Sequence, residues 1–366
     1  MAATIKDVTH KLEQLAPKFY QEDYDNSGLI TGNPNAPVTG VLVTLDCTEA
    51  VVDEALQQNC NLIVAHHPIL FKGIKKLTGQ NYVERTLIKA IQNNVAIYAI
   101  HTNLDNVHTG VNRKIAEQIG LTNLKILAPR ANTLLKLVTF IPEAQAENVR
   151  NHLYAAGAGQ IGHYKNCSFS VVGEGTFLPS EKANPFQGTQ GKPELATEVR
   201  VEVILPIPAR DKVLQALKAN HPYEEVAYYL TALENDNQEV GAGMIGELAE
   251  PMQPLVFLEH VKKTMVAGCV RHTALPNKPI KKVAVCGGSG SFLLQKAIGL
   301  GADAFISADF KYHEFFDADG RILIADIGHY ESEQFTKDLI IAFLRENFAT
   351  FAVAFSKVVT NPISYL

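Results

Sequence analysis

Residues 40–68 read GVLVTLDCTEAVVDEALQQNCNLIVAHHP, and this stretch decides the fold class. GVLVTLD is typical of a buried strand, TEAVVDEALQQN of a helix, and NLIVAHHP of a second buried strand. The segments VERTLIKAIQNN and VAIYAIHTNLD then repeat the helix and the strand. Strands that alternate with helices of this length predict an α/β fold with a mostly parallel sheet that is covered on both faces.

The same order of elements returns near the C-terminus. Residues 281–313 predict strand, helix and strand, and residues 321–344 predict a further strand and helix. IYAIHTNLD in the first half and LIADIGHYESE in the second each carry a histidine after an apolar strand, with a carboxylate four residues later. We interpret this as an internal duplication whose strand ends face one another across a cleft. An amphipathic helix within residues 5–19 and a polar loop over residues 25–37 precede the first half.

The pattern changes between the halves, from about residue 130 to about residue 235. Two strand-helix-strand units follow one another there, which is the order of a split βαβ, ferredoxin-like arrangement. Residues 181–196 have the Gly, Pro and Gln content of a surface loop. We therefore expect residues 1–129 and 236–366 to form one duplicated domain and residues 130–235 to form an inserted α+β domain.

Composition excludes several classes of protein. The chain has 366 residues, 46% of them hydrophobic, and a net charge of -5. Its basic residues are scattered, so nucleic-acid binding is disfavoured. Five widely spaced cysteines without a C-x-x-C pair fit a reduced interior. No signal peptide and no run of 18 apolar residues is visible, which favours a soluble cytoplasmic protein without membrane contact.

Histidines gather where the predicted strands end. His66 and His67 lie at the rim of the sheet, where open α/β proteins bind ligands. Neighbouring residues of a strand point to opposite faces, so the pair could serve two metals, or one could bind while the other packs. Two hydrogen-bonded or partly exposed histidines are the alternative for this pair alone.

The other strand ends strengthen the metal interpretation. We expect six candidate ligands to converge at one edge of one sheet, namely His66, His67, His101, Asp105, His329 and Glu333. Nitrogen and carboxylate ligands suit Zn, Mn, Fe or Ni, and more than four of them suit two ions. The alternative is a polar rim held together by hydrogen bonds.

Two further motifs each allow two interpretations. Backbone N–H groups of Gly287, Gly288, Ser289 and Gly290, between a strand and a helix, could bind an anion; alternatively the glycines only allow a tight turn. The third glycine of a dinucleotide fingerprint is replaced by Leu293, which disfavours NAD. In HPYEE, residues 221–225, the histidine and the two glutamates could bind an effector or a metal, but a turn followed by a solvated face is the better interpretation.

The runs YDNSGLITG (24–32), HHP (66–68), HTNLD (101–105), GGSGS (287–291) and GHYESE (328–333) together resemble the NIF-three-like family of GTP cyclohydrolase I type 2 homologues. The resemblance covers the whole chain, with an insert similar to the PII-like or CutA-like middle domain of long members. It implies a toroidal homohexamer and a dinuclear site. It places His67 and Asp105 on one metal, His66 and His329 on the other, Glu333 across both, and His101 beside them as an acid/base.

The resemblance implies a metal-dependent hydrolase in which His101 and Glu333 serve catalysis and activated water attacks a nucleotide such as GTP. A phosphodiesterase or pyrophosphatase could use the same two divalent ions. A third possibility is a non-catalytic metal-binding toroid that acts as a regulator or scaffold, whose insert senses a small molecule or binds a partner.

Overall fold

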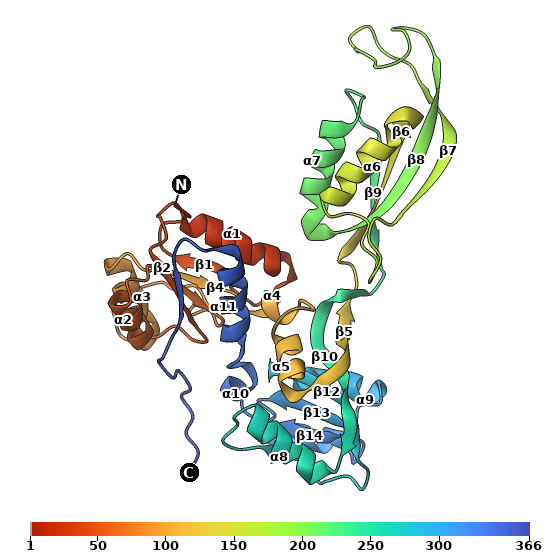
Figure 1. The fold of residues 1–366 in the computed structure, drawn as a ribbon. Coiled ribbons are helices and arrows are strands. Elements are labelled where there is room, and N and C mark those ends of the chain that lie inside the picture. Colours follow the sequence, from red (N-terminus) through yellow and green to blue (C-terminus); the bar gives the residue numbers. More distant parts are fainter. Residues whose placement is uncertain (1) are drawn as a thin grey trace. The chain divides into compact units, whose positions relative to one another are not determined.

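The computed structural model describes residues 2–366, which form two compact units (Figure 1). The two ends of the chain, up to Pro129 and from Glu239 onward, build the first unit, called here the main unit. Residues Arg130–Gln238 build the second, called the insert. In residues 2–366, no helix has both the length and the apolar character that crossing a bilayer requires.

The first sheet of the main unit has five strands, four from the N-terminal half and one from the C-terminal end of the chain. In spatial order its strands are β1 (Gly28–Thr31), β4 (Ala96–Ala99), β3 (Leu62–Ala65), β2 (Gly40–Thr44) and β15 (Ala352–Phe355). The last four run parallel, and β1 pairs antiparallel with β4. β1 lies inside the stretch expected to be a polar loop, because a four-residue strand leaves too short a pattern to detect.

Helices cover both faces of this sheet. They are α1 (Ile5–Leu15), α2 (Glu49–Gln57), α3 (Tyr82–Gln92) and α11 (Thr336–Asn347). Side chains alternate along β3: Ile63 and Ala65 pack with α2 and α3, whereas Leu62 and Val64 pack with α1 and α11. This two-sided burial explains why the strands are apolar at every position.

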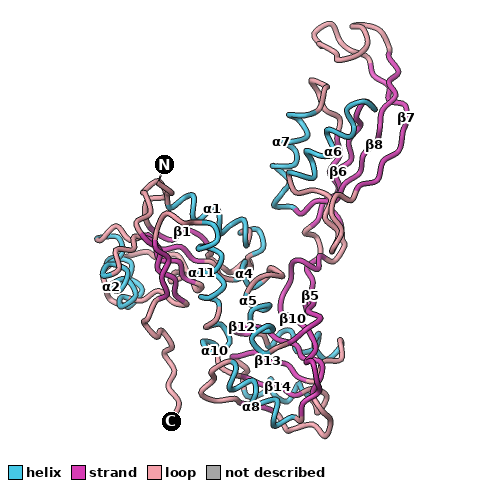
Figure 2. The backbone as a smooth tube through the Cα atoms, in the orientation of Figure 1, coloured by secondary structure: helices cyan, strands magenta, loops and turns pink. Residues whose placement is uncertain are grey.

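The second sheet of the main unit has six strands, most of them from the C-terminal half (Figure 2). In spatial order they are β11 (Arg271–His272), β14 (Leu323–Asp326), β13 (Ala304–Ala308), β12 (Ile280–Ser289), β10 (Asn237–Met252) and β5 (Leu121–Arg130). β12, β13 and β14 are parallel to one another. The helices around this sheet are α5 (Val111–Ile119), α8 (Pro254–Thr264), α9 (Leu294–Gly299) and α10 (His329–Glu333).

The α/β class with largely parallel strands is confirmed. The expectation that all candidate ligands meet at the edge of one sheet is wrong, because the main unit contains two separate sheets. One hydrophobic cluster contains residues from both sheets, including Val64 of β3 and Val285 of β12. The two sheets therefore share a core, and their strand ends border the same site.

The insert folds as a four-stranded antiparallel sheet with two helices on one face. The spatial order is β7 (Ser168–Phe177), β8 (Glu194–Pro206), β6 (Leu134–Pro142) and β9 (Tyr228–Leu233). The helices α6 (Ala146–Ala155) and α7 (Arg210–Asn220) connect the strands in β-α-β-β-α-β order. Leu137 and Val201 of the sheet pack against Val149 and Leu217 of the helices. Element order and strand order are those of the split βαβ arrangement.

Candidate metal centre

His66 and His67 follow β3 directly, and the backbone fixes their rings in different directions. Their N–H groups donate to the carbonyls of Thr44 and Leu45, which extends the pairing with β2. His66 is fully buried, and its Nδ1 donates to the Ile100 carbonyl at 2.8 Å. Burial lowers the pKa of His66 to about 3, so the ring is neutral. With the proton on Nδ1, Nε2 presents an unshared electron pair.

That electron pair faces a buried carboxylate. His66 Nε2 lies 3.6 Å from Asp105 Oδ1 and 3.9 Å from Glu333 Oε2. Asp105 keeps 22% of its side chain exposed, but its Oδ1 is shielded, and neither this oxygen nor His66 Nε2 has a hydrogen-bond partner among the described residues. Burial, followed by the charge of Glu333, raises the pKa of Asp105 well above its usual range. Leaving such groups unpaired costs about 1–3 kcal/mol each, and a shared cation removes this cost, so the donors fit a metal.

A second set of donors surrounds Glu333, which ends the single-turn helix α10. Glu333 Oε2 lies 2.9 Å from His67 Nε2 and 3.1 Å from His329 Nε2. The two Nε2 atoms are 3.4 Å apart. Burial opposes protonation, but hydrogen bonds to carboxylates raise the pKa of His67 to about 9 and that of His329 to about 11. Two imidazolium groups therefore lie against one carboxylate oxygen. A bound metal cation could take the place of the two protons between these rings and the carboxylate. His66, His67 and Glu333 alone bring three ligand atoms within 4.8 Å of one another.

Two aspartates that sequence reasoning missed orient the rings of this set. Asp46 Oδ1 accepts a hydrogen bond from His67 Nδ1 at 2.8 Å, and Asp309 Oδ2 accepts one from His329 Nδ1 at 2.7 Å. Thr360, in the C-terminal segment, donates to Asp46 Oδ2 at 2.6 Å. Metal-binding histidines commonly have such carboxylate partners, which fix the ring and direct Nε2 at the ion. Their sequence signal was their place just after the apolar strands β2 and β13.

His101 lies beside the donors rather than among them. It precedes the short helix α4 (Thr102–Asp105), and its Nδ1 donates to Asp25 Oδ1 at 2.7 Å. Its ring centroid is 5.4 Å from those of both His66 and His67. The spacing of four residues brings His329 next to Glu333 in the second half of the chain. In the first half it does not pair His101 with Asp105, because His101 contacts Asp25 and Asp105 lies next to His66. Asp25 belongs to the YDNSG run and was missed as a partner.

Comparison with known proteins identifies the fold and its family. A model described as Duf34/NIF3 (NGG1p interacting factor 3) matches residues 3–362. The chain belongs to the Duf34/NIF3 family. The Duf34/NIF3 resemblance seen in HHP, HTNLD and GHYESE is thus confirmed.

Relatives match along the whole length of this Duf34/NIF3 chain. A Halalkalibacterium halodurans protein named GTP cyclohydrolase 1 type 2 homolog is 38% identical over 365 residues, which cover 98% of each chain. A Bacillus subtilis protein of the same name is 37% identical over 367 residues, covering 99% of this chain and 98% of the relative. The crystal structure of a Bacillus cereus protein related to NIF3 is 37% identical, covers 100% of both chains and matches with a TM-score of 0.89.

The donor side chains lie in two pairs that differ from the metal sharing implied by the Duf34/NIF3 resemblance. His66 lies next to Asp105, and His67 lies next to His329, with Glu333 near both pairs. The implied grouping had joined His67 with Asp105 and His66 with His329. The reason is local, because consecutive rings at the end of β3 diverge: His66 turns inward to the Ile100 carbonyl and His67 turns outward to Asp46.

The donors open into a cavity of about 770 Å³ that includes Gly287, Gly288 and Ser289. The N–H groups of Gly287 and Gly288 already donate to Asn112 Oδ1 and Ser332 Oγ, each at 2.9 Å, and so are not free for an anion. Gly288 has a φ of +59°, and a Cβ there would meet Glu333 Oε1 at 2.5 Å. Glycine is required at this position because the chain passes close to the Duf34/NIF3 donor set.

Proposed function

We propose that this Duf34/NIF3 protein is a metal-dependent hydrolase that holds two divalent ions per chain. The observation that carries the proposal is the shielded, unprotonated Nε2 of His66 opposite Asp105 Oδ1, next to a second histidine set around the same Glu333. Two separate groups of donors that share one carboxylate fit two ions better than one. His66 and Asp105 would hold one ion and His67 and His329 would hold the other, with Glu333 available to both.

Imidazole and carboxylate donors suit Zn, Mn, Fe or Ni, and three protein donors per ion leave coordination positions open. When bound, such ions supply Lewis-acid chemistry that activates water and polarises the bond under attack. Asp46 and Asp309 hold the rings of His67 and His329 in place. Glu333, with 3% of its side chain exposed, lies next to both donor sets.

His101 is the residue we propose for proton transfer. Asp25 fixes its Nδ1, so only Nε2 remains to exchange a proton with a substrate in the cavity that His101 lines. The side chain of Asp25 is fully buried and also accepts a hydrogen bond from the Thr102 N–H at 3.0 Å. This arrangement holds the imidazole in one orientation beside the metal donors.

The cavity supports a nucleotide or a related molecule as substrate. Its volume of about 770 Å³ is in the range of small-molecule sites. Tyr24, Phe71 and Phe292 line it while leaving 70%, 54% and 70% of their surfaces exposed, and such rings can stack on a purine. The name GTP cyclohydrolase 1 type 2 homolog, carried by relatives, makes GTP the first substrate to test. The proposal includes the homohexameric toroid implied by the family, which light scattering would test.

The deciding experiment is a turnover assay read by mass spectrometry. Protein reconstituted separately with Zn, Mn, Fe(II) and Ni is incubated with GTP and with a panel of phosphodiesters and pyrophosphates. The variants are Glu333→Gln and, as a matched control, Glu117→Gln, whose side chain is 50% exposed on α5. Metal-dependent product that disappears in Glu333→Gln and persists in Glu117→Gln is the expected result. Product from phosphoesters alone would change the substrate class, and two bound ions without product from any substrate would favour a regulatory or scaffold role.

A further inference from the structure

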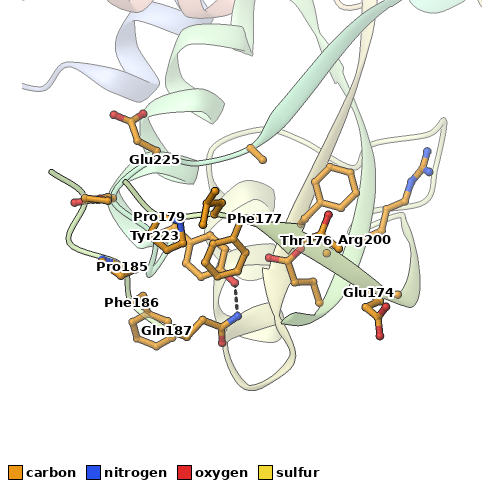
Figure 3. Close-up of a pocket in the computed structure, with 18 of the residues that line it drawn as sticks. Glu174, Thr176, Phe177, Pro179, Pro185, Phe186, Gln187, Arg200, Tyr223 and Glu225 are labelled. Carbon is orange, nitrogen blue, oxygen red and sulfur yellow. Dashed lines mark hydrogen bonds between the residues drawn. The ribbon is translucent and has the colours of Figure 1, made fainter. Parts of the chain in front are cut away.

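A second cavity lies wholly within the insert, on residues that the metal centre does not use (Figure 3). Its volume is about 660 Å³, which is again in the range of small-molecule sites. The floor is the face of the sheet opposite α6 and α7, and the walls come from the β7–β8 connection and from the turn before β9. The inference below is independent of the proposed hydrolase function.

Strand alternation explains how this floor forms. Val199 and Val201 of β8 point to the helices, so Glu198 and Arg200 point to the open face. A Cβ at Gly175, on the neighbouring strand β7, would collide with the Glu198 carboxylate. Glycine at this position therefore leaves room for the Glu198 side chain at the floor of the cavity.

Aromatic rings line the walls and remain partly exposed. Phe186 lies 6.1 Å from Tyr223 between ring centroids, and Phe140 lies 5.9 Å from Tyr229. Phe186 and Tyr229 expose 54% and 62% of their surfaces. His221 anchors the turn that carries Tyr223: its Nε2 donates to the Phe140 carbonyl, and its Nδ1 accepts from the Tyr223 N–H. The turn interpretation of the HPYEE run is thus correct for its histidine.

The charge of the lining is negative. Four carboxylates, those of Glu174, Glu198, Glu224 and Glu225, line the cavity together with one guanidinium. That guanidinium belongs to Arg200 and is paired with Glu202 at 2.8 Å, so it neutralises little of the lining charge. An anionic ligand would meet like charges here, whereas a cation would meet opposite ones.

A short chain of hydrogen bonds orients the central carboxylate. Gln187 Nε2 donates to Tyr223 Oη at 3.0 Å, shown by the dashed line in Figure 3. The Tyr223 hydroxyl in turn donates to Glu198, and burial together with this bond raises the pKa of the hydroxyl. Glu198 is half-buried, and the bond from Tyr223 leaves further electron pairs of the carboxylate available to a ligand.

We propose that this cavity binds an organic cation with a planar or apolar body, of the amine or amidine class. The cationic group pairs with the Glu198 carboxylate, because charge-assisted hydrogen bonds are the strongest available in such a site. The body packs against the rings of Phe186, Tyr223 and Tyr229, whose faces attract positive charge. The proposal assigns the insert a binding site of its own.

Benzamidine, benzamide and benzoate test this proposal, because they share one shape and differ in charge. Their binding to the full-length protein, kept in EDTA, is measured by ligand-observed NMR and calorimetry. Benzamidine is expected to bind about tenfold or more tightly than benzamide, and benzoate is expected not to bind. Glu198→Gln keeps the shape and removes the charge, so it is expected to weaken benzamidine binding by about tenfold or more.

Glu147→Gln is the matched control, because Glu147 is exposed on α6, behind the other face of the sheet. It is expected to leave benzamidine affinity unchanged, and circular dichroism confirms that both variants are folded. Equal binding of benzamidine and benzamide, undiminished benzamidine binding in Glu198→Gln, or no benzamidine binding at all would each overturn the proposal.

Discussion

Metal binding to His67, His329 and Glu333 is predicted to release protons and to strengthen as the pH rises. In the metal-free protein, the hydrogen bonds that His67 makes to Asp46 and Glu333 raise its pKa to about 9 although burial opposes this. The ring is therefore protonated at neutral pH. A nitrogen ligand must lose its proton before it can bind an ion, so each ion competes with a proton at Nε2.

The size of the effect follows from the pKa of His67. At pH 7 this pKa of about 9 lies roughly two units higher, which weakens the apparent metal affinity about 100-fold, or about 2.7 kcal/mol. The His67 side chain is only 14% exposed, so solvent screens the interaction little. His329 has a pKa of about 11 but is 38% exposed, and screening reduces its share; we therefore base the magnitude on His67 alone. From pH 7 to pH 9, where half of the His67 rings are still protonated, the association constant is expected to rise about 50-fold.

Calorimetric titration of Ni²⁺ into EDTA-treated and desalted protein measures this directly. At each pH, titrations in buffers of different ionisation enthalpy give the number of protons released per ion. We expect at least one proton per ion at pH 7, about half a proton from His67 at pH 9 and little from His67 above pH 10. A binding constant that does not change between pH 7 and pH 9, with the same heat in every buffer, would refute the reasoning.

Three further predictions concern the support around the donors. Asp46→Asn is expected to weaken metal affinity about 10–100-fold in a chelator competition, whereas Asp53→Asn, at an exposed ion pair with Lys89, leaves it unchanged. Gly288→Ala is expected to displace the Glu333 carboxylate and to reduce the amount of bound metal. Gly120→Ala is its control, because that glycine also has a positive φ but has open space around it. His101→Asn is expected to keep both ions and lower turnover about 10²–10⁴-fold, and an unchanged rate would exclude proton transfer by this residue.

The sequence was sufficient for the fold class because apolar strands and helices alternate clearly. Every residue of β3 is buried, and such a run can be read without knowing its neighbours. The number of sheets could not be read, because pairing between strands depends on tertiary contacts. β1 was not predicted for a related reason: its four residues lie in a polar segment and form a strand only through pairing with β4.

The convergence of the candidate donor side chains could be predicted because they sit at strand ends, where topology brings them together. Their partners could not, since Asp46 and Asp309 act through hydrogen bonds between segments that are distant in sequence. The pairing of the donor side chains in this structure was equally out of reach, because it depends on which way consecutive rings turn at the end of β3. Local alternation predicts that His66 and His67 diverge, but not which partner each one meets.

Metal content measured by inductively coupled plasma mass spectrometry tests the central claim most directly. Wild-type protein and Glu333→Gln are stripped with chelator, reconstituted with Zn, and desalted before counting ions per chain. Because Glu333 lies next to both donor sets, the account predicts two ions per chain in the wild type and loss of both in the variant. Two ions retained in Glu333→Gln, or none bound by the wild type, would contradict it.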